Sequence, residues 1–463
     1  MIIHKSYKFQ LFPEEDQAAV LAKHGGNLRF AWNKLLEFAN DFKELNKKFP
    51  SKIELRSQLK IIQKENDFLK RSHSQPIQDA SDKLFDTFIN AIKPKMIEER
   101  KRKIAEAHKL IDPIKKAKAL KKAFEFGFPK FKRKSDFHDS IFYPQFFKIK
   151  KSRIFFPKIG WINYKKHRVM EGTTKFLTIT QDGNRWYVSL TNEVIFTPKK
   201  KVELKKANIV GIDVGLKTFA TLSDGTEIQN PRTLKKYLRK LKKEQQILSR
   251  KELKETEEIK FGKKVKVSSN RRNKQIEKVI KVHRKVKNIR KDFLHKTSNQ
   301  IITKFDGVIL ETLDIKSMLK TNSKAMCRSI LDVSWYEFGR ILEYKCLWND
   351  KYFGKIDQYE PSSQKCNVCG NLQTLTLKDR IYVCPHCGNT CGRDLNASKN
   401  IRDSGMETLE REERLKNTCS TQGINARGEV AQATSTKREK LWIADLNSCR
   451  FPETGIDMVT NPA

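Results

Sequence analysis

The chain has 463 residues, enough for about two to four domains of roughly 100–200 residues each. Its 95 Lys and Arg residues against 54 Asp and Glu residues give a net charge of +41, which indicates a polyanionic partner, most simply nucleic acid. The sequence has no lipidation motif, no signal-peptide apolar region and no apolar run near 18 residues, which disfavours a membrane-surface protein and predicts a soluble intracellular one.

The positive charge is unevenly distributed along the chain. Residues 402–463 contain nine Lys and Arg residues and ten Asp and Glu residues, so the first 401 residues carry a net charge of +42. Residues 231–300 alone contain 25 Lys and Arg residues against seven Asp and Glu residues. We expect nucleic-acid contact from this segment rather than from the C-terminal tail, although a solvated charged face has the same composition.

The first part of the chain is expected to contain one strand and a helical insert. Apolar and polar side chains alternate over residues 1–12, which predicts a strand that ends at Pro13. Apolar side chains at helical spacing then predict helices over residues 14–46 and 75–92. Residues 98–122 are very basic and also fit a helix.

Residues 128–198 are aromatic, β-branched and interrupted by turns, and "QDGNRW" within them is a hairpin signal. We predict a small β-barrel or sandwich, completed by the N-terminal strand. Basic residues alternate with aromatic ones here, a composition that suits base stacking and phosphate contact, although any single ring is more simply a core residue. The aromatic residues are Phe142, Tyr143, Phe146, Phe147, Phe155, Phe156, Trp161 and Tyr164.

From residue 207 the pattern alternates between strands and helices, which is typical of an α/β domain. Residues 207–226 predict a strand, a turn and a second strand, and residues 231–300 predict two long helices joined by a polar loop near 261–270. Beyond residue 402 the periodicity is lost. Between residues 300 and 402 we expect three further elements, which are a strand at 305–315, a helix at 327–349 and a strand at 351–360.

Four of the nine cysteines form two C-x2-C pairs separated by 14 residues, and a glycine follows each pair. This spacing predicts a structural zinc ribbon, with an iron–sulfur cluster or free thiols as the alternatives. Four thiolates close the coordination sphere, so we expect no catalytic water on this metal. The predicted zinc ligands are Cys366, Cys369, Cys384 and Cys387.

Three carboxylates stand at positions that suggest chemistry. Asp213 and Glu311 each follow an apolar strand, and Asp394 lies in a helical segment after the second cysteine pair. A single acid at a strand end is commonly a solvated turn residue. Three acids that converge would offer the oxygen ligands that Mg²⁺ or Mn²⁺ prefers, and a two-ion site of this kind cleaves phosphodiesters.

Other catalytic signatures are missing from the sequence. It contains no G-x-x-x-x-G-K-[ST] phosphate loop, no H-E-x-x-H motif and no G-x-S-x-G elbow. The nine histidines are scattered, and none receives a role.

These motifs resemble the TnpB proteins of bacterial and archaeal insertion sequences, also called the OrfB transposase family. "GIDVGLKTFAT", "ILETLDI", "PSSQKCNVCG" and "CGRDLNASKNI" stand in the order and spacing of that family. Its N-terminal features are matched by "YKFQLFP", "LRFAWN" and "FYPQFFKIKKSRIFFPKIGWI". The resemblance covers residues 1–401, with one departure at Cys391–Gly392, where the family often has a polar or charged residue.

The resemblance implies an α/β RNase H-like (RuvC-like) nuclease domain interrupted by a zinc ribbon. It also implies an N-terminal β-barrel wedge domain that carries a helical recognition insert. The expected boundaries are residues 1–12 and 124–204 for the wedge domain, 13–123 for the insert, 205–360 and 388–402 for the nuclease domain, 361–387 for the ribbon, and 403–463 for a mostly disordered tail.

The resemblance further implies an RNA-guided, Mg²⁺-dependent DNA endonuclease of the prokaryotic cytoplasm, at the nucleoid when bound to DNA. Asp213, Glu311 and Asp394 would be its catalytic acids and would hold Mg²⁺ or Mn²⁺, while the four cysteines would hold Zn²⁺. Its partners would be a guide RNA from the transposon end and double-stranded target DNA with a short adjacent motif. The oligomeric state stays open.

Two other functions stay open. A transposase acting directly on transposon-end DNA can use the same three acids, and a need for guide RNA would separate it from a guided nuclease. A guided DNA-binding repressor without cleavage is disfavoured, because all three acids are present.

Overall fold

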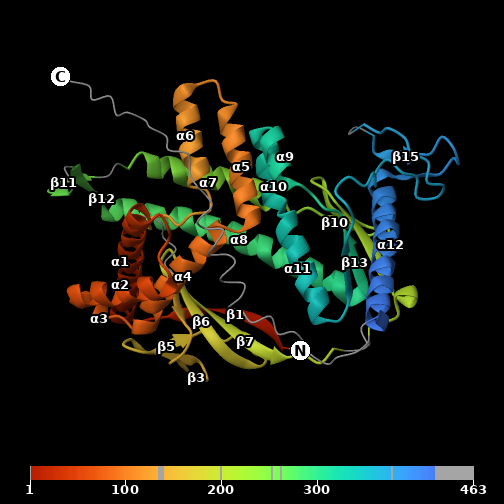
Figure 1. Cartoon of the computed structure of the whole chain (residues 1–463). Helices are drawn as coiled ribbons and strands as arrows, with labels where there is room; N and C mark the ends of the chain where they lie inside the picture. Colours follow the sequence, from red (N-terminus) through yellow and green to blue (C-terminus); the bar gives the residue numbers. More distant parts are fainter. Residues whose placement is uncertain are drawn as a thin grey trace. The chain divides into compact units, whose positions relative to one another are not determined.

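The computed structural model describes residues 2–133, 140–198, 201–251, 254–260, 263–376 and 379–422 (Figure 1). These residues form two compact units, one ending at Phe196 and the other beginning at Thr197. The boundary expected at 204/205 therefore lies earlier in the chain, because Leu204 packs in the core of the second unit.

The first unit is built on a seven-stranded antiparallel sheet with the order β2-β6-β7-β1-β5-β4-β3. β1 pairs with β7 from Ile2 against Ile195 to Leu11 against Trp186, so the N-terminal strand completes a sheet made from later residues, as predicted. The strands are β1 (Ile2–Phe12), β2 (Ser140–Tyr143), β3 (Lys148–Lys150), β4 (Arg153–Phe156), β5 (Gly160–Tyr164), β6 (Thr173–Asp182) and β7 (Arg185–Ile195).

This sheet is open in the part of the chain that the structure describes. No ladder joins its edge strands β2 and β3 there, so the predicted barrel is not observed. The predicted hairpin is present, since β6 and β7 pair down to Asp182 against Arg185 and Gly183 takes a positive φ of 62° in the turn.

Between β1 and β2 the described chain is helical, and its core contains Trp32, Leu35, Leu59, Leu84 and Phe88. The helices are α1 (Glu15–Asn46), α2 (Lys52–Glu65), α3 (Asp67–Lys70), α4 (Ser74–Ala91), α5 (Pro94–His108) and α6 (Pro113–Phe124).

Residues 98–122 are mostly helical, as predicted, but they belong to two helices. The chain breaks between α5 and α6, because Asp112 accepts hydrogen bonds from the N–H groups of Ile114 and Lys115 and so starts a new helix. Pro113 at the first position of α6 favours the same break, since its missing N–H needs no partner there.

The second unit contains a five-stranded mixed sheet with the order β10-β9-β8-β13-β14, which confirms the α/β class. β8, β9 and β10 are antiparallel neighbours, whereas β8, β13 and β14 run parallel. The strands are β8 (Ile209–Val214), β9 (Thr218–Leu222), β10 (Glu227–Gln229), β13 (Gly307–Leu310) and β14 (Tyr352–Lys355).

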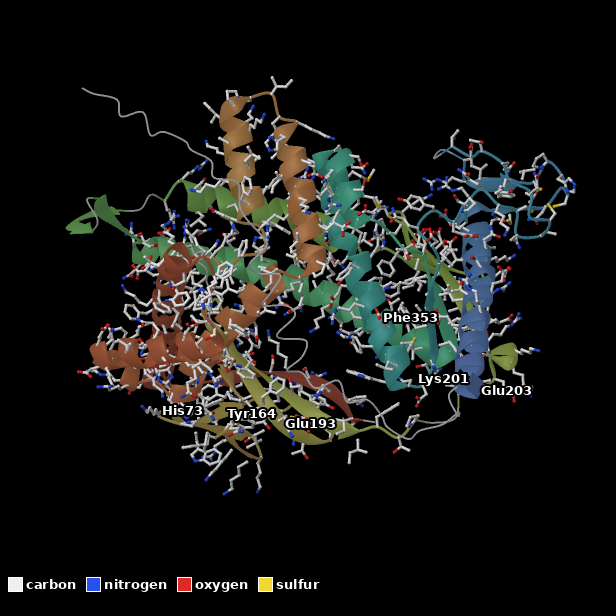
Figure 2. The ribbon with its side chains drawn as sticks, in the orientation of Figure 1. His73, Tyr164, Glu193, Lys201, Glu203 and Phe353 are labelled. Atoms are coloured by element: carbon white, nitrogen blue, oxygen red, sulfur yellow. The ribbon has the colours of Figure 1, made fainter. Side chains whose placement is uncertain are left out.

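Helices cover both faces of this sheet (Figure 1). Alternate residues of β8 and β13, such as Ile212 and Leu310, pack with α8 and α11 in one core, and Phe353 of β14 packs against it (Figure 2). Ile209 and Ile309, with the opposite parity, pack with α12 in a second core. The helices are η1 (Leu204–Lys206), α7 (Thr233–Ser249), α8 (Asn270–Lys304), α9 (Ile315–Thr321), α10 (Lys324–Val333), α11 (Trp335–Trp348) and α12 (Arg393–Gln422).

Two connections differ from the prediction. The long basic helices α7 and α8 are present, but strands β11 (Lys254–Lys260) and β12 (Lys263–Val267) join them where a polar loop was expected. The helix predicted over 327–349 is divided into α10 and α11 at Ser334, whose φ of 60° is left-handed and ends the first helix.

The cysteine-rich segment lies between β14 and α12. Its strands β15 (Ile381–Val383) and β16 (Thr390–Gly392) pair, so the ribbon reaches Gly392 rather than residue 387. α12 continues to Gln422, so the tail expected from residue 403 is helical at its start, and residues 423–463 of the predicted tail lie outside the described part of the chain. No helix in the described residues is long and apolar enough to cross a membrane.

Candidate active site and metal centre

Asp213 and Glu311 occupy matching positions on two adjacent parallel strands. β8 and β13 pair in register with Ile212 opposite Leu310, so Asp213 is the next residue of β8 and Glu311 directly follows the end of β13. Neighbouring strands lie about 4.8 Å apart, and residues one position further point to the opposite face. Because Ile212 and Leu310 face α8 and α11, both carboxylates face the side that α12 covers.

α12 approaches this face so closely that only glycine fits at two points. A Cβ at Gly211 would overlap the carbonyl oxygen of Ser398, and a Cβ at Gly405 would overlap the side chain of Ile309. Asp394 stands four residues before Ser398, about 6 Å along the helix, and Asp213 stands two residues beyond Gly211, about 6.6 Å along the strand. The backbone contact therefore brings Asp394 toward the two strand carboxylates.

Electrostatics of the three acids agree with this placement. Burial, followed by repulsion from Glu311 and from Asp394, raises the pKa of Asp213 well above its ordinary value. Burial raises the pKa of Glu311 to about 7, against a smaller opposing effect of a hydrogen bond from the Val214 N–H. Both side chains keep partial solvent exposure. Buried carboxylates that repel one another are the environment that a divalent cation stabilises.

The three acids do not form a closed metal cage. Among the described residues, the four cysteines are the one group of three or more metal-binding side chains found in close range, with ligand atoms all within 4.8 Å of one another. The acids are electrostatically coupled but are not such a group. Their oxygen chemistry fits Mg²⁺ or Mn²⁺, ions that usually retain several waters.

The raised pKa values predict a pH dependence of the metal-free protein. Folded Glu311 keeps its proton up to about pH 7, whereas the unfolded chain loses it near 4.5. The folded state therefore binds more protons between these values, and the contribution of Glu311 to the free energy of unfolding falls as pH rises through this window. A divalent ion favours the ionised carboxylates, so Mg²⁺ is expected to raise the melting temperature more at about pH 8 than at about pH 6. Calorimetry checks this, and equal effects of Mg²⁺ at both values would contradict it.

The four predicted zinc ligands meet in one cluster. The Sγ atoms of Cys366 and Cys387 are 3.7 Å apart, and those of Cys369 and Cys384 are 3.5 Å apart. A tetrahedron with metal–sulfur bonds of 2.3 Å has edges of roughly 3.8 Å, whereas a disulfide would need about 2.05 Å. The spacing therefore fits a tetrahedral thiolate site. Cys391 packs beside this cluster but is not part of it.

Both turns of the ribbon use the same backbone geometry. The N–H of Gly370 donates to the carbonyl of Cys366, and the N–H of Gly388 donates to the carbonyl of Cys384. Both glycines have positive φ, 78° and 69°, which explains the glycine after each pair. Burial opposes ionisation of Cys366, but N–H groups of Cys369 and Val368 outweigh it and lower the pKa of the thiol to about 6. N–H groups of Cys387 and His386 likewise lower the pKa of Cys384, so the first cysteine of each turn is the one that its backbone favours as a thiolate, whereas the pKa values of Cys369 and Cys387 are raised.

Two residues that the sequence analysis missed are Asn396 and Asn400 of α12. Both side chains are buried, and both bind backbone groups of the ribbon. Their spacing of four residues within "DLNASKN" puts them on one helix face, and two amides on one face next to a metal site were a signal available in the sequence.

Comparison with known proteins identifies the family of this chain. Family models described as a probable transposase and as a Cas12f1-like TNB domain match residues 193–322 and 335–401. A curated relative from Escherichia coli (strain K12), called putative RNA-guided DNA endonuclease InsQ, is 30% identical over 88% of this chain and 93% of its own length. The chain belongs to the TnpB family.

Other TnpB-family relatives are less similar or cover less. A putative RNA-guided DNA endonuclease of Streptomyces pristinaespiralis is 28% identical over 87% of this chain and 90% of its own length. A TnpB-like protein, L79, of Acanthamoeba polyphaga mimivirus is 30% identical over 50% of this chain and 44% of its own length. Family membership therefore rests on the full-length relatives.

Three further comparisons add little to the TnpB assignment. A model described as a helix-turn-helix domain matches residues 1–48, but β1 and the single long helix α1 occupy this range. A Cas12f1–sgRNA–target DNA complex is 14% identical with a TM-score of 0.39, covering 87% of this chain and 99% of its own. CasPhi-2 bound to crRNA is 11% identical with a TM-score of 0.42, covering 87% and 98%. TM-scores this low support no inference about this chain.

The first unit of this TnpB-family chain presents an aromatic and basic surface, which we call the outer face, formed by the exposed side of β3, β4 and β5. In one row Lys148 lies opposite Phe155, and Phe155 opposite Trp161; Lys150 and Arg153 form the next row. The rings of Phe155 and Trp161 are 5.5 Å apart, and Trp161 is 41% exposed. These strands contain no acidic residue. Tyr164 of β5 (Figure 2) belongs to the opposite, buried face.

Proposed function

We propose that this chain is an RNA-guided DNA endonuclease that uses Asp213, Glu311 and Asp394 as the catalytic acids to hydrolyse target DNA. The observation that carries the proposal is that Asp213 and Glu311 each follow the paired residues Ile212 and Leu310, on the sheet face against which α12 brings Asp394. Its membership of a family whose full-length relative is named a putative RNA-guided DNA endonuclease supports the same activity.

The three carboxylates would hold Mg²⁺ or Mn²⁺. When bound, such ions activate a water and stabilise the leaving oxygen in phosphodiester cleavage. Asp213 is repelled by both Glu311 and Asp394, so it is the acid that would share metal ions with each of them. Glu311 would supply ligand oxygens from the end of the neighbouring strand, and Asp394 would supply them from the helix. Partial exposure of these side chains leaves room for a phosphate to approach.

The four cysteines would hold a structural Zn²⁺. Their tetrahedral spacing supports zinc over a disulfide pairing, and all four thiols are donors, so no open position remains for a substrate. We therefore assign the two metal sites different tasks, zinc for folding the ribbon and the divalent site for chemistry.

The partners would be a guide RNA from the transposon end and double-stranded DNA with a short adjacent motif. Base pairing would read the target, and the protein would contact mainly backbone. The net charge of +41 supports binding of polyanions, and the outer face supports stacking of unpaired bases.

Replacing Trp161 with alanine is expected to weaken guide-RNA binding about tenfold, because one aromatic stacking contact is worth roughly 1–3 kcal/mol. The slope of log affinity against log salt should stay unchanged, since no charge is lost. Lys148→Ala should reduce the magnitude of this slope by about 0.7. Filter binding over a salt series measures both, with Trp161→Phe as the control that keeps a ring. Unchanged affinity of Trp161→Ala would show that the outer face does not contact the RNA.

The proposed function is tested by expressing the chain with its native flanking DNA and sequencing the RNA that co-purifies. A discrete RNA that ends outside the element, and that directs Mg²⁺-dependent cleavage of a matching target, is the expected result. Cleavage of transposon ends without RNA would favour the transposase alternative. Guided binding without cleavage would favour the repressor.

A further inference from the structure

We propose that Asn396 and Asn400 couple the four-cysteine site to the acidic site, so that metal occupancy at one alters metal affinity at the other. The proposal rests on the proposed function for the role of the acids, and it assigns both asparagines as positioning residues. It concerns two side chains on α12 that lie between the ribbon and Asp394.

Asn396 forms hydrogen bonds in both directions with the first cysteine turn. Its Nδ2 donates to the carbonyl of Lys365 at 2.7 Å, and its Oδ1 accepts from the N–H of Asn367 at 3.0 Å. These two backbone groups flank Cys366. The Asn396 side chain is fully buried, so each bond lost would leave a buried polar group without its partner.

Asn400 stands one helical turn later and binds the same turn from the same side. Its Nδ2 donates to the carbonyls of Lys365 and Ser362, both at 2.7 Å. The carbonyl of Lys365 thus accepts from both asparagines, and the segment before Cys366 is held along two turns of α12.

The first turn of α12 is also held from the ribbon side. The backbone N–H of Arg393 donates to the carbonyl of Arg380 at 2.9 Å, and its Nη1 donates to the carbonyl of Thr376 at 3.0 Å. Asp394 therefore lies between a ribbon contact at Arg393 and a ribbon contact at Asn396. Its position relative to Asp213 and Glu311 depends on the ribbon as well as on the sheet.

This arrangement has a thermodynamic consequence. The thiolates keep the first cysteine turn folded only when a metal joins them, because structural zinc sites supply folding energy to small motifs. A ribbon that loses its metal loosens the groups that Asn396 and Asn400 bind, and Asp394 loses part of its restraint. Linkage requires reciprocity, so a divalent ion at the acids must tighten zinc binding by the same factor by which zinc tightens the divalent ion.

The test uses the full chain with its co-purified RNA and measures Mn²⁺ binding by calorimetry, zinc content with a chelating indicator, and the Mg²⁺ concentration for half-maximal cleavage. Asn396→Ala and Asn400→Ala are each expected to keep zinc and guided DNA binding. Each should weaken Mn²⁺ binding and raise half-saturating Mg²⁺ by about tenfold, within the range typical of coupled sites. Gln373→Ala is the matched control, because its amide bonds the carbonyl of Val383 within the ribbon.

Two results would overturn the coupling. One is wild-type Mn²⁺ affinity in both asparagine variants with zinc retained. The other is a wild-type chain whose Mn²⁺ affinity is unchanged after zinc chelation, a measurement that decides the question even where a variant fails to fold. Mn²⁺ binding needs no cleavage, so an inactive wild-type chain would count against the proposed function while leaving the coupling measurable.

Discussion

Asp213→Ala is expected to abolish target cleavage, with a loss of about a thousandfold or more, and to leave guided DNA binding unchanged. Asp213 is the carboxylate that repulsion couples to both Glu311 and Asp394, so its removal affects the whole divalent site. A thousandfold loss corresponds to about 4 kcal/mol of transition-state stabilisation. Cleavage of a labelled duplex under single-turnover conditions measures the loss, and gel retardation measures binding.

The isosteric variant Asp213→Asn sharpens this prediction. Burial and repulsion raise the pKa of Asp213, so its ionised form destabilises the metal-free fold. The amide removes that charge, and the variant is therefore expected to melt at a higher temperature than the wild-type chain without Mg²⁺ while failing to cleave. Asp403→Asn is the matched control, because Asp403 is a half-exposed acid on α12 paired with Arg402. Retained cutting by either Asp213 variant would remove this residue from the active site.

Cys384→Ser is expected to lower bound zinc well below one ion per chain and to reduce cleavage about a hundredfold. Cys384 is buried, and its sulfur lies 3.5 Å from that of Cys369, so the hydroxyl of serine cannot replace it as a thiolate ligand. The ribbon should lose its fold, because its core is formed by Cys366, Tyr382 and Cys384. Hydrogen exchange should show faster exchange in the ribbon and unchanged protection in the five-stranded sheet.

Cys391→Ser provides the control for the zinc prediction. Cys391 lies in the same segment and packs beside the cluster, but it is not among the four grouped sulfurs. Its variant is expected to keep zinc, ribbon protection and cleavage. Loss of zinc in Cys391→Ser, or full zinc in Cys384→Ser, would show that the ligand set is assigned wrongly.

The candidate catalytic acids stay a prediction from the sequence, whereas the elements that hold them can be compared with the structure. The strand pattern alone left each acid open as a solvated turn residue, and it was the resemblance to the TnpB family that predicted a shared site for Asp213, Glu311 and Asp394. Their relative placement also depends on Gly211 and Gly405, whose role is visible only once α12 lies on the sheet. Asn396 was missed although its spacing from Asn400 was a signal, because burial of a single amide cannot be read from the sequence.

The errors in the fold have local physical causes. Asp112 and Pro113 start a new helix inside a basic segment that otherwise reads as continuous, and Ser334 ends α10 with a left-handed backbone that favours glycine or asparagine. α12 continues past residue 402 although its apolar stripe is narrow. Ile401 and Leu409 pack it against the sheet, and the glycine contacts let it lie directly on the strands.

The glycine contacts change how decay of this gene would be recognised in related sequences. Here a side chain at Gly211 would displace the carbonyl of Ser398, and with it the helix that carries Asp394, while every acid stays in place. We therefore expect a side chain at residue 211 or 405 of a relative to separate the carboxylates even where all three acids are present.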